Sequence, residues 1–185
     1  MQLKQTLSFL SLVSVLLFIT SCDTTDPFQI PPPDFSTVPP AWDYTVVEGF
    51  DIEPGLTAYI LEESQNQFRV TQRDLVSVRF TLRAIGEDHG PDGEIIFSTF
   101  NNDNTSPISI SVNSINLSTQ IFRYSVALAY TDGFRKGIIG MREGEERTLI
   151  VQPEQGYADL PEGSVNSQYR ESTLQYDIEL RRLTN

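Results

Sequence analysis

Apolar and polar residues alternate along two long stretches of the chain, Val76–Ala84 and Leu174–Leu180. Successive side chains of a β-strand point to opposite faces, so each stretch predicts a strand with one apolar face and one wet face. Shorter apolar runs predict further strands. These runs are Leu56–Leu61, Val70–Arg73, Glu94–Thr99, Ile108–Val112, Phe122–Leu128 and Arg147–Gln152.

The best helical pattern lies in Phe134–Met141, where Phe134, Ile138 and Met141 fall on one face of a helix. Asp132 precedes this window and is suited to cap its N-terminus. Three glycines weaken an isolated helix here, so we expect it to form only where a sheet buries its apolar face. They are Gly133, Gly137 and Gly140. Gly144 then offers a positive-φ turn into the next strand.

An antiparallel sheet with one apolar face, crossed by a single short helix, makes an α+β domain. The prediction is therefore an antiparallel five- to six-stranded sheet curved around one short helix. This domain is expected to occupy residues 45–185.

Residues 1–44 do not fit such a domain. Lys4 gives a short positive start, and Leu10–Ile19 is almost wholly apolar but too short to span a bilayer. Residues 1–21 are therefore predicted to be a secretory signal. Residues 22–44 are rich in proline, a composition that favours extended polyproline structure, so we expect a semi-rigid linker there.

Cys22 follows Ile19, Thr20 and Ser21, an order that resembles a bacterial lipobox. Such signals are cut before the cysteine, which then becomes lipidated. We therefore expect a lipid anchor on Cys22 and a location in the bacterial cell envelope, on the periplasmic or outer-membrane side. The alternative is an ordinary signal peptide with a chance cysteine. Because Cys22 is the only cysteine, no disulfide is possible within one chain.

The charge balance narrows the class of partner. The formal net charge is −12, and it becomes −13 when Lys4 leaves with the signal. A charge of this sign argues against a phosphate backbone as partner, so no nucleic acid is expected. It also argues against electrostatic docking on anionic lipid, so contact with the membrane depends on the acyl chains at Cys22.

No familiar catalytic constellation is visible in the sequence. His89, the single histidine, stands beside Glu87, Asp88 and Asp92, but the acids do not follow the spacing of a calcium loop. A solvated turn is the preferred interpretation, and no metal is expected. Neither a Ser/His/Asp triad nor a glycine-rich phosphate loop is present, so no cofactor is expected either.

A run of motifs near the C-terminus carries more information. Gly133–Phe134 opens the predicted helix, Gly140–Glu145 reads Gly-Met-x-x-Gly-Glu, and a strand follows. Pro153 and Gly156–Ala158 come next, and the run closes with "STLQYDIELRRL" at Ser172–Leu183. This order resembles the C-terminal half of FKBP-type peptidyl-prolyl isomerases.

The likeness extends over Gly55–Leu183, since Arg73–Ala84 resembles the family's early strand. It implies the FKBP fold and a chemistry that needs no nucleophile. The barrier to rotation about an X-Pro bond arises from the partial double bond of the amide. A dry aromatic pocket that holds the proline ring and favours the twisted amide lowers this barrier without covalent catalysis.

The resemblance implies a pocket with one floor ring, one hydrogen-bonding tyrosine and four wall residues. They are Phe134 as the floor, Tyr157 as the donor to a ligand carbonyl, and Tyr176, Phe97, Phe80 and Ile108 as the walls. Thr131 would present its backbone N–H to the ligand. We expect the rings to surround one open apolar cavity.

The chain departs from the family pattern at several places. Phe134 replaces a tryptophan, and Tyr176 stands where the family has a wall phenylalanine on its last strand. Ser98 replaces the aspartate that follows the wall phenylalanine at the position of Phe97. Asn166–Ser172 stands in place of an Ile-Pro-Pro loop, and the stretch that includes Ser114–Tyr130 is longer than usual. The inserted residues are therefore candidates to cover or remodel the mouth of the pocket.

Two functions follow from these observations. The first is an isomerase-like folding factor that acts on exported, proline-containing proteins in the cell envelope. The second is an FKBP-fold binding or chaperone module with a degenerate site, anchored by lipid. The unusual Ser98 and Asn166–Ser172 favour the second, and the motif run Gly133–Leu183 favours the first.

Overall fold

The computed structural model describes residues 31–113 and 125–184, which are the residues discussed from here on. Those from Pro33 onwards belong to one compact unit. No helix in these two ranges is long and apolar enough to cross a bilayer. The signal, the lipidation site and the first part of the predicted linker lie outside the described residues.

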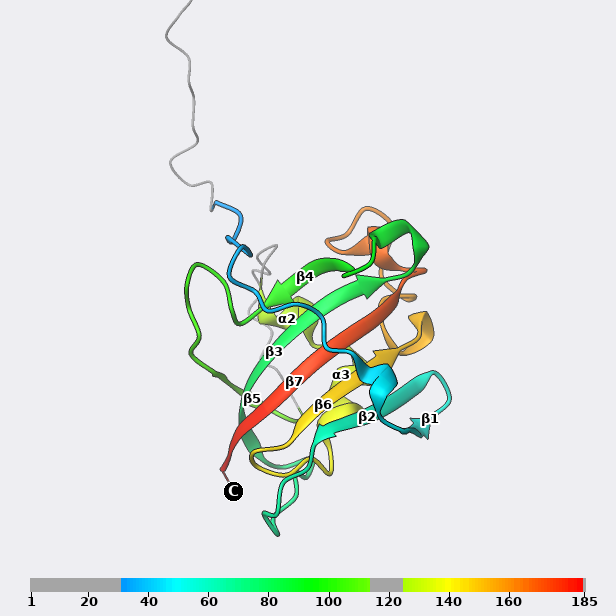
Figure 1. Cartoon of the computed structure of the whole chain (residues 1–185). Helices are drawn as coiled ribbons and strands as arrows, with labels where there is room; N and C mark the ends of the chain where they lie inside the picture. The colour runs from blue at the N-terminus through cyan, green and yellow to red at the C-terminus, as the bar shows by residue number, and fades with distance from the viewer. Residues whose placement is uncertain (1–30, 114–124, 185) are drawn as a thin grey trace, which may run out of the picture. The chain divides into compact units, whose positions relative to one another are not determined.

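An antiparallel sheet forms the body of the domain (Figure 1). Its strands within the described ranges are β1 Gly49–Glu53, β2 Leu56–Glu62, β3 Leu75–Ile85, β4 Glu94–Ser98, β5 Ile108–Ser111, β6 Glu146–Val151 and β7 Thr173–Thr184. The order across the sheet is β1-β2-β6-β7-β3-β4, and β5 also pairs with β3. This arrangement confirms the predicted α+β class, with β1 as a strand that the sequence pattern did not indicate.

Short helical segments join the strands. They are α2 Val126–Ala129, α3 Asp132–Ile138, and the 3-10 turns η1 Tyr44–Val46, η2 Glu87–His89, η3 Pro153–Gln155 and η4 Ser167–Tyr169. The predicted helix is α3, but its cap is Thr131, whose hydroxyl accepts a hydrogen bond from the N–H of Phe134 at 3.2 Å. Asp132 is instead the first helical residue, where its charge still faces the positive helix end.

Two predicted strands are absent from the described residues. Of Phe122–Leu128, the part from Ser125 onwards leads into α2, and the rest is outside the described ranges. A short apolar run such as "VALA" fits a helix as well as a strand, and the Ser125 hydroxyl caps the helix by accepting from the N–H of Ala127. Val70–Arg73 is a turn whose Val70 N–H bonds the carbonyl of Met141 at 2.9 Å.

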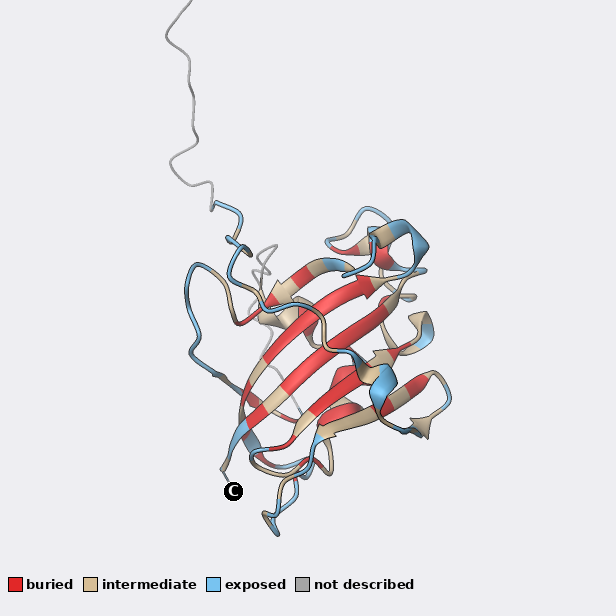
Figure 2. Cartoon of the chain, viewed as in Figure 1, coloured by how far each residue is buried: buried red, intermediate tan, exposed pale blue. Residues whose placement is uncertain are grey.

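The inner face of the sheet and α3 enclose the hydrophobic core (Figure 2). Alternate residues of β3 and β7 lie fully buried on this face. In the register of the two strands, Leu82 stands opposite Tyr176 and Phe80 opposite Ile178. The helix lies so close to β6 that a Cβ added to Gly137 would collide with Leu149. Glycine at this position therefore lets α3 approach the sheet closely enough to exclude water.

The outer face of the sheet carries a buried ion pair between Arg83 and Asp177. The two groups lie 2.9 Å apart, and each side chain is only 3% exposed. A second oxygen of Asp177 accepts hydrogen bonds from Thr148 and Gln175, both at 2.9 Å. Burial lowers the pKa of Arg83 and raises that of Asp177, so the loss of hydration outweighs the attraction between the two charges.

A strap formed by residues 39–44 covers this ion pair. Arg83 donates to the carbonyl of Pro39 at 2.5 Å, and the N–H of Trp42 donates to Asp177 at 3.1 Å. In Figure 1 this segment, drawn blue to cyan, crosses the outer face of β3, β7 and β6. Part of the sequence assigned to the linker at 22–44 thus lies on the sheet, and the upstream boundary of that linker stays a prediction.

Removal of the charge on Asp177 should therefore be costly. Asp177→Asn leaves the buried Arg83 guanidinium without its paired carboxylate, and we expect it to lower the free energy of unfolding by about 3–5 kcal/mol. The matched control is Glu179→Gln, which breaks the pairs with Arg79 and Arg181 at a more exposed site and should cost less than about 1 kcal/mol. Urea unfolding of the two variants measures both values, and equal losses would contradict this account.

Candidate functional site

Four of the predicted pocket residues form one aromatic cluster on the inner face. The ring centre of Phe80 lies 5.1 Å from that of Phe97, 4.8 Å from that of Phe134 and 6.2 Å from that of Tyr176. The rings of Phe134 and Tyr176 are 5.0 Å apart. These residues come from β3, β4, α3 and β7, so the fold assembles the cluster from four separate parts of the chain.

The remaining two predicted residues take different places. Tyr157 follows η3 and is buried, with 4% of its surface exposed. Ile108 stands at the start of β5 opposite Val78, where it is half-buried against the core. It therefore borders the core next to the cluster and adds no ring to it.

The cluster does not surround an open cavity. Phe80, Phe134 and Tyr176 expose 0% of their surface. The expectation of an open apolar pocket is therefore wrong for the state of the protein that this structure shows. A substrate proline cannot reach these three rings until something moves.

The segment Ser125–Tyr130, the last part of the predicted insertion, closes the site. The Tyr157 hydroxyl donates to the carbonyl of Leu128 at 2.5 Å, and the Tyr176 hydroxyl donates to the carbonyl of Ala129 at 2.8 Å. Two tyrosine hydroxyls that face the site are thus bonded to the backbone of one short segment. The sequence named this insertion as a candidate cover, and the part of it in the described ranges does cover the cluster.

Tyr130 anchors the C-terminal end of this segment. Its ring meets Phe134 edge-on at 5.5 Å and 66°. Its hydroxyl donates to the carbonyl of Ser111 at 2.7 Å and also contacts that of Val112, so it is fastened to the end of β5. Burial raises the pKa of Tyr130 to about 12.

Thr131 links the closing segment to α3. Tyr176 uses its single proton on Ala129, so the hydrogen bond of 2.9 Å between Tyr176 and Thr131 has the threonine as donor. Thr131 also caps α3, as described above. Burial raises the pKa of both Tyr157 and Tyr176 above the ordinary value.

The wall beyond Phe97 carries a hydroxyl where the family has a carboxylate. Ser98 is fully buried, its Oγ lies 2.9 Å from that of Thr81, and it accepts from the N–H of Phe100 at 3.0 Å. All of its hydrogen-bonding capacity is directed at its own strand pair and turn. Ser98 therefore places no charge against the cluster.

The loop that replaces the family's Ile-Pro-Pro segment contacts Tyr157 from the other side. Asn166 adopts a left-handed backbone conformation with φ of 67°, and its amide donates to the Tyr157 hydroxyl at 3.3 Å. Sequence reasoning missed this residue and the carbonyls of Leu128 and Ala129. One signal was available: Tyr176 carries a hydroxyl where the family has phenylalanine, and a buried hydroxyl requires a partner.

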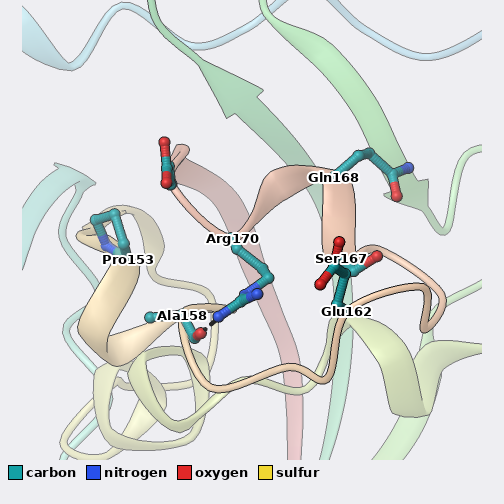
Figure 3. A pocket seen from close by; sticks show the side chains of 7 residues that line it. Pro153, Ala158, Glu162, Ser167, Gln168 and Arg170 are labelled. Atoms are coloured by element: carbon teal, nitrogen blue, oxygen red, sulfur yellow. Dashed lines mark hydrogen bonds between the residues drawn. The ribbon is translucent and has the colours of Figure 1, made fainter.

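An open hollow lies elsewhere, beside the loop that carries Tyr157 (Figure 3). It has a volume of about 630 Å³ and a mixed polar and apolar lining of Pro153, Ala158, Glu162, Ser167, Gln168, Arg170 and Glu171. Arg170 donates to the carbonyl of Ala158 at 3.1 Å across it. None of the six predicted pocket residues lines this hollow.

His89 is held by neighbouring side chains. Its Nε2 lies 3.0 Å from the hydroxyl of Ser172, and its Nδ1 lies 3.3 Å from a carboxylate oxygen of Glu94. Within the described ranges, no group of three or more His, Cys, Asp and Glu residues is arranged to hold a metal ion.

Solved structures of other proteins are similar to this chain. A peptidyl-prolyl cis-trans isomerase from Pseudomonas syringae pv. tomato is similar at 17% identity and a TM-score of 0.52, over 74% of this chain and 81% of that one. The N-terminal domain of FKBP42 from Arabidopsis thaliana is similar at 16% identity and a TM-score of 0.56, over 80% of this chain and 99% of that one. At such identities the likeness shows the fold alone.

No curated protein sequence matches the chain. The family model described as FKBP-type peptidyl-prolyl cis-trans isomerase does match, over residues 67–181. This range contains the whole aromatic cluster and the loop of Tyr157. The chain belongs to the FKBP-type peptidyl-prolyl isomerase family.

Proposed function

We propose that the chain is a peptidyl-prolyl isomerase-like folding factor that acts on exported proteins in the bacterial cell envelope. Family membership and fold support the isomerase-like function and proline-containing peptides or proteins as its clients. The secretory signal and the lipobox-like Ile19–Cys22 support the location and a lipid anchor on Cys22.

The observation that carries the proposal is the convergence of Phe80, Phe97, Phe134 and Tyr176 beside Tyr157. Aromatic rings and a hydroxyl donor can together favour the twisted amide over the planar one. Apolar walls remove water from the proline ring, and a donor to a carbonyl oxygen holds the peptide while the C–N bond turns. No nucleophile, base or metal has a part in this chemistry.

A second candidate is a binding or chaperone module without catalysis. The specific observation in its favour is that Tyr157 and Tyr176 already donate to the carbonyls of Leu128 and Ala129. Ser98 supplies no carboxylate to the wall, which also points in this direction. In this case the aromatic cluster would serve as core, and clients would bind elsewhere on the domain.

An isomerisation assay on a Leu-Pro-Phe peptide separates the two candidates. The chain from Asp23 to Asn185 is expected to speed cis-trans isomerisation of the Leu-Pro bond. Without a catalyst this isomerisation takes tens to hundreds of seconds. Absence of acceleration at micromolar protein would remove the isomerase from consideration.

The same assay tests the wall residues. Phe97→Ala should lower the rate constant severalfold, because it removes a half-buried ring that contacts Phe80. The matched control is Phe100→Ala, which removes a half-buried ring that lies beside Arg79 and outside the cluster. Equal effects of the two substitutions on the rate would show that the cluster is not the site.

Lipid attachment is tested by metabolic labelling with a radioactive fatty acid. The full chain, expressed in a bacterium, should incorporate the label and sediment with membranes, because the acyl chains bury their methylenes in the bilayer. Cys22→Ser should lose both properties, and Thr24→Ala should keep them. An unlabelled wild-type chain would favour the ordinary signal peptide.

A further inference from the structure

We propose that Ser125–Ala129 is an internal ligand of the prolyl site, which occupies the place of a client and must leave before a client binds. This inference rests on the proposed function, because it takes the aromatic cluster as the client site. It adds a mode of regulation: the protein carries its own competitor.

Tyr157 already bonds the kind of group that a client would supply. Family resemblance gives this hydroxyl to a carbonyl of the bound peptide, and here it donates to the backbone carbonyl of Leu128 at 2.5 Å. The segment therefore offers the site the same chemical group that a client would offer. The bond is made by backbone, as it would be with a peptide of any sequence.

Tyr176 carries a hydroxyl at a position where the family has phenylalanine. It is fully buried and donates to the carbonyl of Ala129 at 2.8 Å. Thr131 donates to its oxygen, so the hydroxyl is held in one orientation, aimed at the segment. The extra oxygen thus works as a latch on the closing segment.

The rest of the segment Ser125–Ala129 is held weakly. The helix α2 has four residues, Val126–Ala129, and so short a helix is not stable by itself. Val126, Ala127 and Leu128 are only half-buried, and Ala129 is the one fully buried residue among Ser125–Ala129. Such segments open at a small fraction of the cost of global unfolding.

The closing segment also has a natural limit on its motion. Tyr130 is fastened to the end of β5 through Ser111, and Thr131 caps α3. Release of Ser125–Ala129 therefore leaves α3 and Phe134 in place. The site that opens keeps its floor, its walls and the hydroxyl of Tyr157.

The apparent affinity for a client is the affinity of the open form multiplied by the fraction of molecules that are open. A single buried hydrogen bond changes such an equilibrium by about twofold to tenfold. Tyr176→Phe removes the latch and keeps the ring. It should therefore strengthen client binding by about twofold to tenfold, without loss of the Tyr157 donor.

The experiment compares the mature wild-type chain with Tyr176→Phe and Ser125→Ala. Ser125→Ala removes the cap of α2 without touching the core, and so decides the question if Tyr176→Phe does not fold. Three quantities are measured: the Kd for a Leu-Pro-Phe peptide, the kcat/KM for its isomerisation, and hydrogen exchange at the amides of Leu128–Tyr130. The control is Tyr169→Phe, whose hydroxyl donates to Glu94.

Tighter peptide binding and faster exchange in the two test variants, with Tyr169→Phe like the wild type, support the internal ligand. If these changes occur in a protein that never isomerises the peptide, the internal ligand stands and the catalytic function fails. Unchanged Kd, kcat/KM and exchange in both test variants overturn the internal ligand, even in a protein that isomerises the peptide well. Weaker binding by both variants overturns it too.

Discussion

The pairing of β3 with β7 determines what lies on each face of the domain. The two strands pair antiparallel from Leu75 opposite Thr184 to Ile85 opposite Thr173, with one shift in register between Ser77 and Val78. This pairing turns Phe80 and Tyr176 inward, and Arg83 and Asp177 outward. Because strand side chains alternate, a slip of β7 by one residue would turn Asp177 into the core, away from Arg83, and Tyr176 out of the aromatic cluster. The aromatic site and the strap both depend on this register.

The inner face could be predicted well from the sequence. Period-two alternation identified β3 and β7, and the spacing of Phe134, Ile138 and Met141 identified α3. These signals are strong because they repeat over several residues and reflect burial against a single surface. Gly144, predicted as a positive-φ turn, has φ of 86°.

The closing segment could not be predicted in the same way. Its bonds join hydroxyls of Tyr157 and Tyr176 to backbone carbonyls far away in the sequence, and a carbonyl belongs to every residue. No pattern of side chains marks which carbonyl will be used. The strap is hidden for a similar reason, since the polar residues Arg83 and Asp177 suggested a wet face until a second segment covered them. The sequence therefore predicted rings that do lie together in the structure, but not whether they are open to solvent.

The strap has a mechanical consequence. A pull on the N-terminal end of the domain first reaches Asp34, which exchanges two hydrogen bonds with Asn102 in the loop after β4. It then reaches Pro39 and Trp42, which are bonded to Arg83 on β3 and Asp177 on β7. These two strands lie inside the sheet, whereas β1, the next strand along the chain, lies at its edge. Load from a tether would thus be received by the most strongly paired strands before the edge strand feels it. An anchor point at the centre of a sheet protects its edge from being peeled away.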